Sequence, residues 1–137
     1  TGESAERPPL VVVDAANVVG SVPDGWWRDR AGATTRLRDS LTPIAATGLT
    51  GPGTPDWVRQ PPLEVVLVVE GKARDVGGTD QVRVVSATGS GDDAIVDLVR
   101  DEGVDRRCVV ITADRGLRTR VSALGAEVLG PRTVRPS

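Results

Sequence analysis

Short apolar runs alternate along the chain with segments whose apolar residues recur every three or four positions. Most of the runs are rich in valine. Valine-rich runs without polar alternation are typical of strands covered on both faces, as in a parallel sheet. We therefore predict five strands, over residues 10–13, 65–69, 82–85, 108–111 and 127–129.

The helical spacing of apolar residues predicts helices over residues 26–47, 92–102 and 115–124. Pro43 is expected to kink or interrupt the first of them. Gly103 is expected to end the second, and Gly125 follows the third. Strands and helices in alternation predict an α/β fold with a parallel sheet and right-handed crossovers.

Residues 47–62 break this order, because they hold seven glycines and prolines. We interpret them as a long surface loop that forms a rim over the functional site. The whole chain of 137 residues has room for one domain, 1–137, with a flexible N-terminus over residues 1–9.

Charge excludes one class of binding protein. Nineteen acidic and seventeen basic residues leave a net charge of −2, which argues against a chain that holds nucleic acid or membrane by bulk charge. Binding of RNA would need a local patch. No apolar run is long enough to span a bilayer, and no basic segment followed by an apolar one opens the chain. We expect a soluble, cytoplasmic protein that does not bind membranes.

Missing residue types limit the possible chemistry. The chain has no histidine and one cysteine, so it cannot build a Ser-His-Asp triad, a Cys-His dyad or an ordinary zinc site. Cys108 lies in an apolar run, where a small buried residue is expected. The only aromatic residues are Trp26, Trp27 and Trp57. We interpret Trp26 and Trp27 as core or hinge residues rather than a base-stacking platform. Acid–base or metal chemistry would have to use carboxylates.

Three predicted strands end in an acid. Asp14, Glu70 and Asp114 each follow an apolar run directly or within three residues. Because the carboxyl ends of parallel strands lie at one edge of a sheet, these side chains would converge if their strands are neighbours. Ligands of such sheets bind at that edge, where the strand order reverses.

A further acidic segment opens the helix predicted over residues 92–102. On a helical wheel, Asp92 lies beside the apolar face and Asp93 points outward. Carboxylates forced together repel, and a divalent cation relieves the repulsion. All-oxygen ligands favour Mg²⁺ or Mn²⁺, and two such ions can support phosphodiester cleavage. The candidate metal ligands are Asp14, Glu70, Asp92, Asp93 and Asp114.

Each of these residues also has an ordinary structural interpretation. An acid after a strand can cap the next helix, Asp93 can complement a helix dipole, and Asn17 can be an N-cap. The glycines around Ser90 are weak evidence of phosphate binding. Arg115, Arg118 and Arg120 can form a solvated helix face. Arg115 directly follows Asp114, however, so we include Asn17, Ser90 and Arg115 as candidate substrate contacts.

Three motifs together resemble one protein family. Asp14 ends a valine run and Asn17 follows three residues later, which is similar to the first-strand motif of the NYN branch of PIN-like nucleases. Asp92 stands three residues before Ile95, as in PIN domains. Asp114 and Arg115 resemble the Asp-Arg signature of the YacP-like subgroup. The resemblance covers most of the chain in order, although the Gly/Pro-rich stretch departs from the compact family pattern.

The resemblance implies a PIN-like three-layer α/β/α sandwich and a metal-dependent ribonuclease. Carried over by position, Asp14, Asp92 and Asp114 would be the catalytic, metal-binding acids, and Asn17 would orient a ligand. Glu70 stands where related sequences often have Asp. The first hypothesis is therefore an endoribonuclease that uses Mg²⁺ or Mn²⁺ and binds RNA.

Other hypotheses stay open. The same acids could hydrolyse a nucleotide or another small phosphoester, which needs no extended basic track. An inactive PIN-like domain that binds RNA or protein is a third hypothesis. A receiver-type phosphoacceptor domain is weaker, because it needs a second acid near the first strand and a lysine after the last. A homo-oligomer or a protein partner is compatible with all of them.

Overall fold

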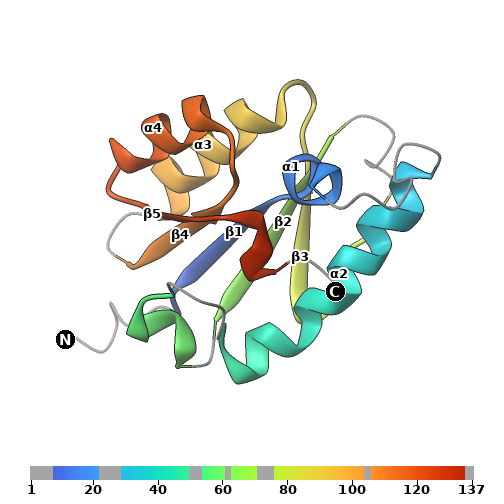
Figure 1. The fold of residues 1–137 in the computed structure, drawn as a ribbon, viewed down its shortest axis with the longest axis horizontal. Helices are drawn as coiled ribbons and strands as arrows, with labels where there is room; N and C mark the ends of the chain where they lie inside the picture. Colours follow the sequence, from blue (N-terminus) through green and yellow to red (C-terminus); the bar gives the residue numbers. More distant parts are fainter. Residues whose placement is uncertain are drawn as a thin grey trace.

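A central parallel sheet organises the chain. The computed structural model describes residues 8–21, 29–49, 54–60, 63–70, 76–103 and 106–134. These residues form a five-stranded sheet with helices on both faces, the three-layer α/β/α architecture expected from the sequence (Figure 1). Each strand lies within one residue of its predicted range. The strands are β1 (Leu10–Asp14), β2 (Glu64–Val69), β3 (Val82–Ser86), β4 (Cys108–Ile111) and β5 (Glu127–Leu129).

The strand order places β1 at the centre of the sheet. The order is β3-β2-β1-β4-β5, and all four pairings are parallel. The chain builds outward from β1 through β2 to β3, and then crosses to the other side of β1 to form β4 and β5. The strand order therefore reverses between β1 and β4. In open parallel sheets, the carboxyl edge at this position is where ligands bind.

Helices cover both faces of the sheet. One face carries α1 (Ala15–Gly20) and α2 (Arg30–Thr47), and the other carries α3 (Gly91–Glu102) and α4 (Arg115–Ser122) (Figure 1). Two short 3-10 helices, η3 (Asp56–Arg59) and η5 (Pro131–Thr133), complete the described elements. The helices at 92–102 and 115–124 are confirmed within two residues at each end.

Side chains alternate between the two faces along each strand. Val11 and Val13 pack in the core under α1 and α2, whereas Leu10 and Val12 pack in the core under α3 and α4. Both sets are buried, which explains why the strands read as continuous apolar runs. The same period of two residues turns Asp14 toward the α3 and α4 side of the sheet.

Cys108 belongs to the core under α3 and α4. Burial raises the pKa of its thiol to about 11, so the thiol stays protonated near neutral pH. The residue therefore packs as a small apolar side chain, which confirms the prediction from the sequence.

Two helical predictions need correction. The helix α1 was not predicted, because six residues are too few to show a helical period. The helix α2 continues through Pro43 to Thr47, so the predicted interruption is wrong. Pro43 lies on the exposed side of α2, where the carbonyl group that loses its N–H partner can bind water. Trp26 and Trp27 lie outside the described residues.

The Gly/Pro-rich segment also differs from its interpretation. Leu49 and Val58 are buried, and the Leu49 N–H donates to the Val58 carbonyl oxygen at 2.7 Å. Trp57 Nε1 donates to Glu127 Oε2 at 2.6 Å, and the Arg107 guanidinium lies 5.8 Å from the centre of the Trp57 ring. Glu127 and Arg107 stand at the amino ends of β5 and β4. The described part therefore lies opposite the carboxyl edge, and its interpretation as a rim over the site is wrong.

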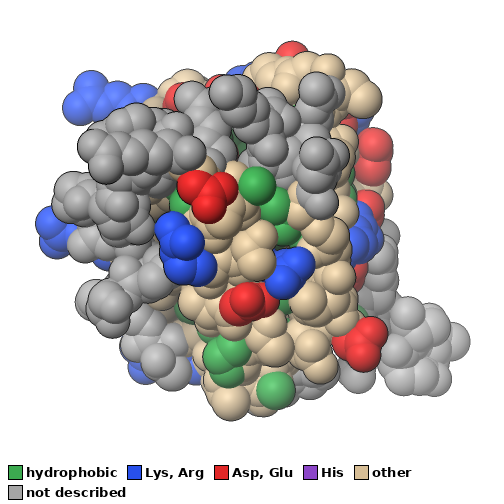
Figure 2. All heavy atoms as spheres, turned by 90° about the vertical axis from the view of Figure 1, so that its right-hand side faces the viewer, with side chains coloured by type: hydrophobic (Ala, Val, Ile, Leu, Met, Phe, Trp, Pro, Cys, Tyr) green, Lys and Arg blue, Asp and Glu red, His purple; other side chains and the backbone are tan. Residues whose placement is uncertain are grey.

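The surface over α2 mixes both signs of charge. Figure 2 looks at this side of the molecule and shows basic and acidic side chains interspersed. Arg36 and Asp39 are among the exposed charged residues of α2. Among the described residues, no helix is long and apolar enough to cross a membrane.

Candidate functional site

Asp14 ends the central strand and is 4% exposed. Its Oδ2 accepts a hydrogen bond from the Thr112 hydroxyl at 2.9 Å, and its Oδ1 accepts one from the Asn17 N–H at 3.4 Å. Burial raises the pKa of Asp14 from 3.8 to about 6. The two hydrogen bonds oppose this rise, and the negative charges of Asp92 and Glu70 add to it. Asp14 is thus a buried acid that titrates near neutral pH.

Thr112 joins two of the predicted acids, and sequence reasoning did not single it out. The residue is fully buried. Its hydroxyl donates to Asp14 and accepts a hydrogen bond from the Asp114 N–H at 3.1 Å. One signal was available: Thr112 is a polar residue at the end of an apolar strand, and the two-residue period places it on the same face as Asp14.

Asn17 connects the first helix to the end of β4. Its side-chain Oδ1 accepts a hydrogen bond from the Ala113 N–H at 2.8 Å. The interpretation of Asn17 as an N-cap is wrong, because Asp14 caps α1 and Asn17 stands in its first turn. The Asn17 Nδ2 group makes no hydrogen bond to a described residue. It is therefore available to donate to an oxygen of a ligand.

Asp114 caps α4, as the ordinary interpretation of an acid after a strand predicts. Its Oδ1 accepts a hydrogen bond from the Leu117 N–H at 2.9 Å. The second carboxylate oxygen makes no hydrogen bond within the described part of the chain. Capping therefore occupies one side of this carboxylate and leaves the other side available.

Glu70 follows β2 and contacts the start of α3. Its Oε2 accepts a hydrogen bond from the Gly91 N–H at 3.0 Å. A Cβ atom at Gly91 would collide with that oxygen, so this position needs glycine while Glu70 stays in place. Ser90 is the N-cap of α3, and its Oγ accepts a hydrogen bond from the Asp92 N–H at 3.1 Å. Ser90 and Glu70 together fix the first turn of α3.

Asp92 lies in this first turn, within electrostatic reach of the other acids. Burial raises its pKa most, the negative charges of Asp114 and Glu70 raise it further, and the positive charge of Arg120 opposes the rise. Four separate segments thus bring four carboxylates to the carboxyl edge of β1, β2 and β4. We call these residues the acidic cluster: Asp14, Glu70, Asp92 and Asp114.

Asp93 lies apart from the acidic cluster. Its Oδ1 forms an ion pair with Arg120 Nη2 at 3.0 Å, which links α3 to α4. The Asp93 side chain is 69% exposed. Its outward direction agrees with the helical wheel and with an ordinary role at the helix surface, so this position does not favour Asp93 as a metal ligand.

The donor set of the acidic cluster suits a hard divalent cation. All of its donors are carboxylate oxygens, the ligand type that Mg²⁺ and Mn²⁺ prefer. The raised pKa values of Asp14 and Asp92 reflect in part a mutual repulsion that a cation would offset. Within the described residues, no three acids are grouped as closely as metal ligands. Cation binding would therefore draw the carboxylates together.

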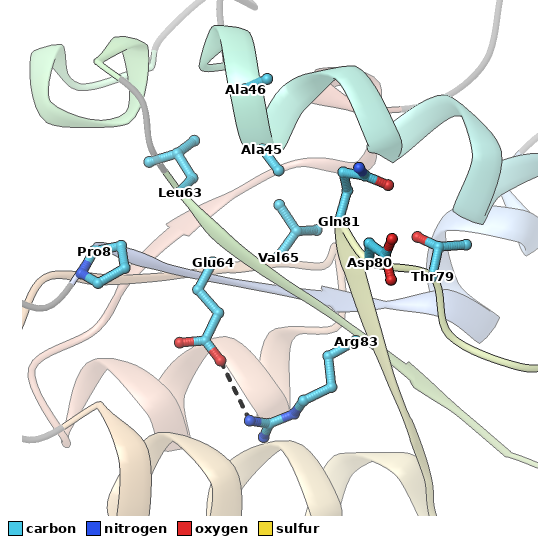
Figure 3. A pocket seen from close by; sticks show the side chains of 10 residues that line it. All are labelled: Pro8, Ala45, Ala46, Leu63, Glu64, Val65, Thr79, Asp80, Gln81 and Arg83. Carbon is cyan, nitrogen blue, oxygen red and sulfur yellow. Dashed lines mark hydrogen bonds and ion pairs between the residues drawn. The ribbon is translucent and has the colours of Figure 1, made fainter.

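Two cavities lined by described residues flank the sheet. One of 370 Å³ lies beside the start of α3, where Thr88, Ser90 and Asp93 are among its lining residues. Another of 430 Å³ lies at the amino ends of β2 and β3, where an ion pair of 3.3 Å joins Glu64 and Arg83 (Figure 3). The second cavity is at the opposite edge of the sheet from the acidic cluster. The first is at the same edge as the cluster, although none of the four clustered acids lines it.

Comparison with known proteins supports the fold. The sequence matches no protein-family model and no curated protein. The structure is similar to the crystal structure of a mutant of Rae1 (YacP) from Bacillus subtilis. The TM-score is 0.63, the sequence identity is 15%, and the match covers 92% of this chain and 72% of that chain. At this identity the likeness concerns the fold alone. It agrees with the three-layer α/β/α architecture that the motif resemblance implied.

Proposed function

We propose that the protein is a metal-dependent endoribonuclease that cleaves RNA phosphodiester bonds at the acidic cluster. One observation carries the proposal: acids from four segments converge at the carboxyl edge of the sheet, where its strand order reverses. The motif resemblance to NYN nucleases and the fold likeness to YacP support it.

Each residue has a distinct role in this proposal. Asp14, Asp92 and Asp114 would hold the cation, and Glu70 would keep the first turn of α3 in place. Bound Mg²⁺ or Mn²⁺ supplies positive charge to the phosphate and acidifies water. Asn17 Nδ2 and the exposed Arg115 would also contact the phosphate oxygens.

The proton of the attacking water needs an acceptor. The chain has no histidine, so a carboxylate must take this role. Asp92 and Asp114 are the candidates, because each has a carboxylate oxygen that makes no hydrogen bond to a described residue. Asp14 is less suitable, since both of its oxygens already accept hydrogen bonds.

The surroundings favour RNA over a nucleoside triphosphate. The cavity beside the start of α3 is lined by no described basic residue that would bind a triphosphate chain, and its two acids, Asp93 and Asp97, are each paired with an arginine. A polymer needs only one phosphate at the acidic cluster, and its other phosphates can lie on basic surface elsewhere.

A substrate comparison tests the proposal. Purified protein with Mn²⁺ is assayed on labelled single-stranded RNA and on nucleoside triphosphates, each with and without EDTA. We expect RNA cleavage that EDTA stops and that Asp114→Asn abolishes. Turnover of triphosphates without RNA cleavage would replace the proposal with a small-phosphoester hydrolase. RNA binding without turnover of either substrate would make the domain a binding module.

A further inference from the structure

The three arginines of α4 divide into two groups. Leu117 and Val121 point into the core, which fixes the orientation of the helix. Arg120 lies on the side that faces α3, where it pairs with Asp93. Arg118 lies on the far side of α4, and Arg115, three residues earlier, shares its direction. Arg115 and Arg118 are exposed, and neither forms an ion pair with a described residue.

A third exposed arginine follows the neighbouring strand. The Thr112 N–H donates to the Leu129 carbonyl oxygen at 3.0 Å, so β4 and β5 leave the sheet side by side. The chain then enters η5, which packs against α1 (Figure 1). Arg132 of η5 is exposed and has no ion pair with a described residue. Because η5 follows the carboxyl end of β5 and packs against α1, Arg132 belongs to the layer opposite to α4.

The charge of this part of the chain differs from that of the whole. Residues 115–134 contain four arginines and one glutamate, a net charge of +3 in a protein whose net charge is −2. The glutamate, Glu127, is held by Trp57 at the amino end of β5, away from the site. Across the acidic cluster, α3 carries five acids and one arginine. Positive charge therefore lies on the β4 and β5 side of the site, and negative charge on the α3 side.

We propose that Arg115, Arg118 and Arg132 form a basic face that binds the phosphates of an RNA strand leading into the acidic cluster. This inference rests on the proposed function and adds the route of the substrate. Phosphates are attracted to unpaired guanidinium groups and repelled by the acids of α3. The strand therefore crosses the edge of the sheet over β4 and β5 and does not run along α3. Arg118 and Arg132 become substrate-binding residues in addition to Arg115.

The salt dependence of RNA binding tests the basic face. A labelled, unstructured RNA of twelve nucleotides is titrated with protein in EDTA at several KCl concentrations, and binding is followed by fluorescence anisotropy. The triple variant Arg115→Gln/Arg118→Gln/Arg132→Gln is compared with the wild type. Each phosphate contact in single-stranded nucleic acid contributes about 0.7 to the slope of log K against log salt. We expect the slope to decrease by about 2 and the affinity to fall at least tenfold at low salt.

Arg36→Gln is the matched control, because Arg36 is an exposed arginine of α2 without an ion pair to a described residue. It should leave the slope and the affinity unchanged, and thermal unfolding should show that all variants are folded. Equal slopes for the wild type and the triple variant would overturn the inference, as would an equal effect of Arg36→Gln. In these cases RNA cleavage by the wild type would leave the proposed function intact. A wild type that neither binds nor cleaves RNA would overturn both.

Discussion

The buried Thr112 hydroxyl donates a hydrogen bond to Asp14 Oδ2 at 2.9 Å, and the hydroxyl oxygen of Thr112 accepts one from the Asp114 N–H at 3.1 Å. Asp14, which ends β1, and Asp114, which follows β4, are therefore connected through the Thr112 side chain. Their relative position depends on strand pairing and on this hydroxyl rather than on a loop. A site built in this way is held in place before a ligand arrives.

Thr112→Val should loosen this connection. Valine has nearly the same shape, but it leaves the buried Asp14 Oδ2 and the Asp114 N–H without a partner. We expect the free energy of unfolding to fall by about 1–3 kcal/mol, as measured by urea denaturation. RNA cleavage should fall as well, because the two carboxylates lose their common anchor.

Thr112→Ser is the matched control for this substitution, since it keeps the hydroxyl and removes only a methyl group. It should retain most of the cleavage activity. If Thr112→Val were as active as Thr112→Ser, the hydroxyl would have no part in arranging the site.

Asp14 should make stability depend on pH. Its pKa is about 6 in the folded protein and 3.8 in an unfolded chain, so between these values the folded state binds more protons. Stability must then fall as the pH rises from about 4 to 6, by up to about 3 kcal/mol, and level off above that range. Asp14→Asn cannot titrate, so this part of the pH dependence should be absent from the variant.

Urea denaturation of both proteins from pH 4 to 8, without divalent cations, measures this effect. The difference in unfolding free energy, wild type minus variant, should decrease with rising pH. A difference that stays constant over this range would mean that Asp14 has an ordinary pKa.

Substitutions at Glu70 and Gly91 distinguish a positioning role of Glu70 from direct metal binding by Glu70. Glu70→Gln keeps an oxygen that can accept the Gly91 N–H, so we expect RNA cleavage to fall no more than about tenfold. Gly91→Ala places a methyl group against Glu70 Oε2 and displaces the carboxylate. It should therefore reduce the cleavage rate more than Glu70→Gln does, as initial rates in Mn²⁺ would show. If Glu70→Gln lost as much RNA cleavage activity as Asp14→Asn, Glu70 would instead be a direct metal ligand.

The fold could be predicted closely from the sequence, because strands buried on both faces leave continuous apolar runs. The ends of β4 and β5 agree with the sequence to the residue. Helix α1 was missed, since it follows β1 directly and its six residues are too few to show a helical period. The expected interruption at Pro43 was wrong, because proline removes one hydrogen bond of α2, whereas Leu37 and Leu41 still pack the helix on the core.

The site was predictable where residue order alone determines position. Asp14, Glu70 and Asp114 follow strands of a parallel sheet, so topology brings them to one edge. Thr112 could not be identified in this way, because its role depends on which strand pairs with β1. The location of the segment around Trp57 likewise depends on a contact with Glu127, seventy residues away in the chain.

Titration of Mn²⁺ by isothermal calorimetry, with RNA cleavage measured on the same samples, tests the central claim most directly. The proteins are the wild type, Asp14→Asn and Asp97→Asn; Asp97 is an exposed acid of α3 that pairs with Arg100 at 2.9 Å. The wild type and Asp97→Asn should bind Mn²⁺ and cleave RNA, and Asp14→Asn should do neither. Binding and cleavage by Asp14→Asn at the wild-type level would contradict the claim that the acidic cluster is the active site.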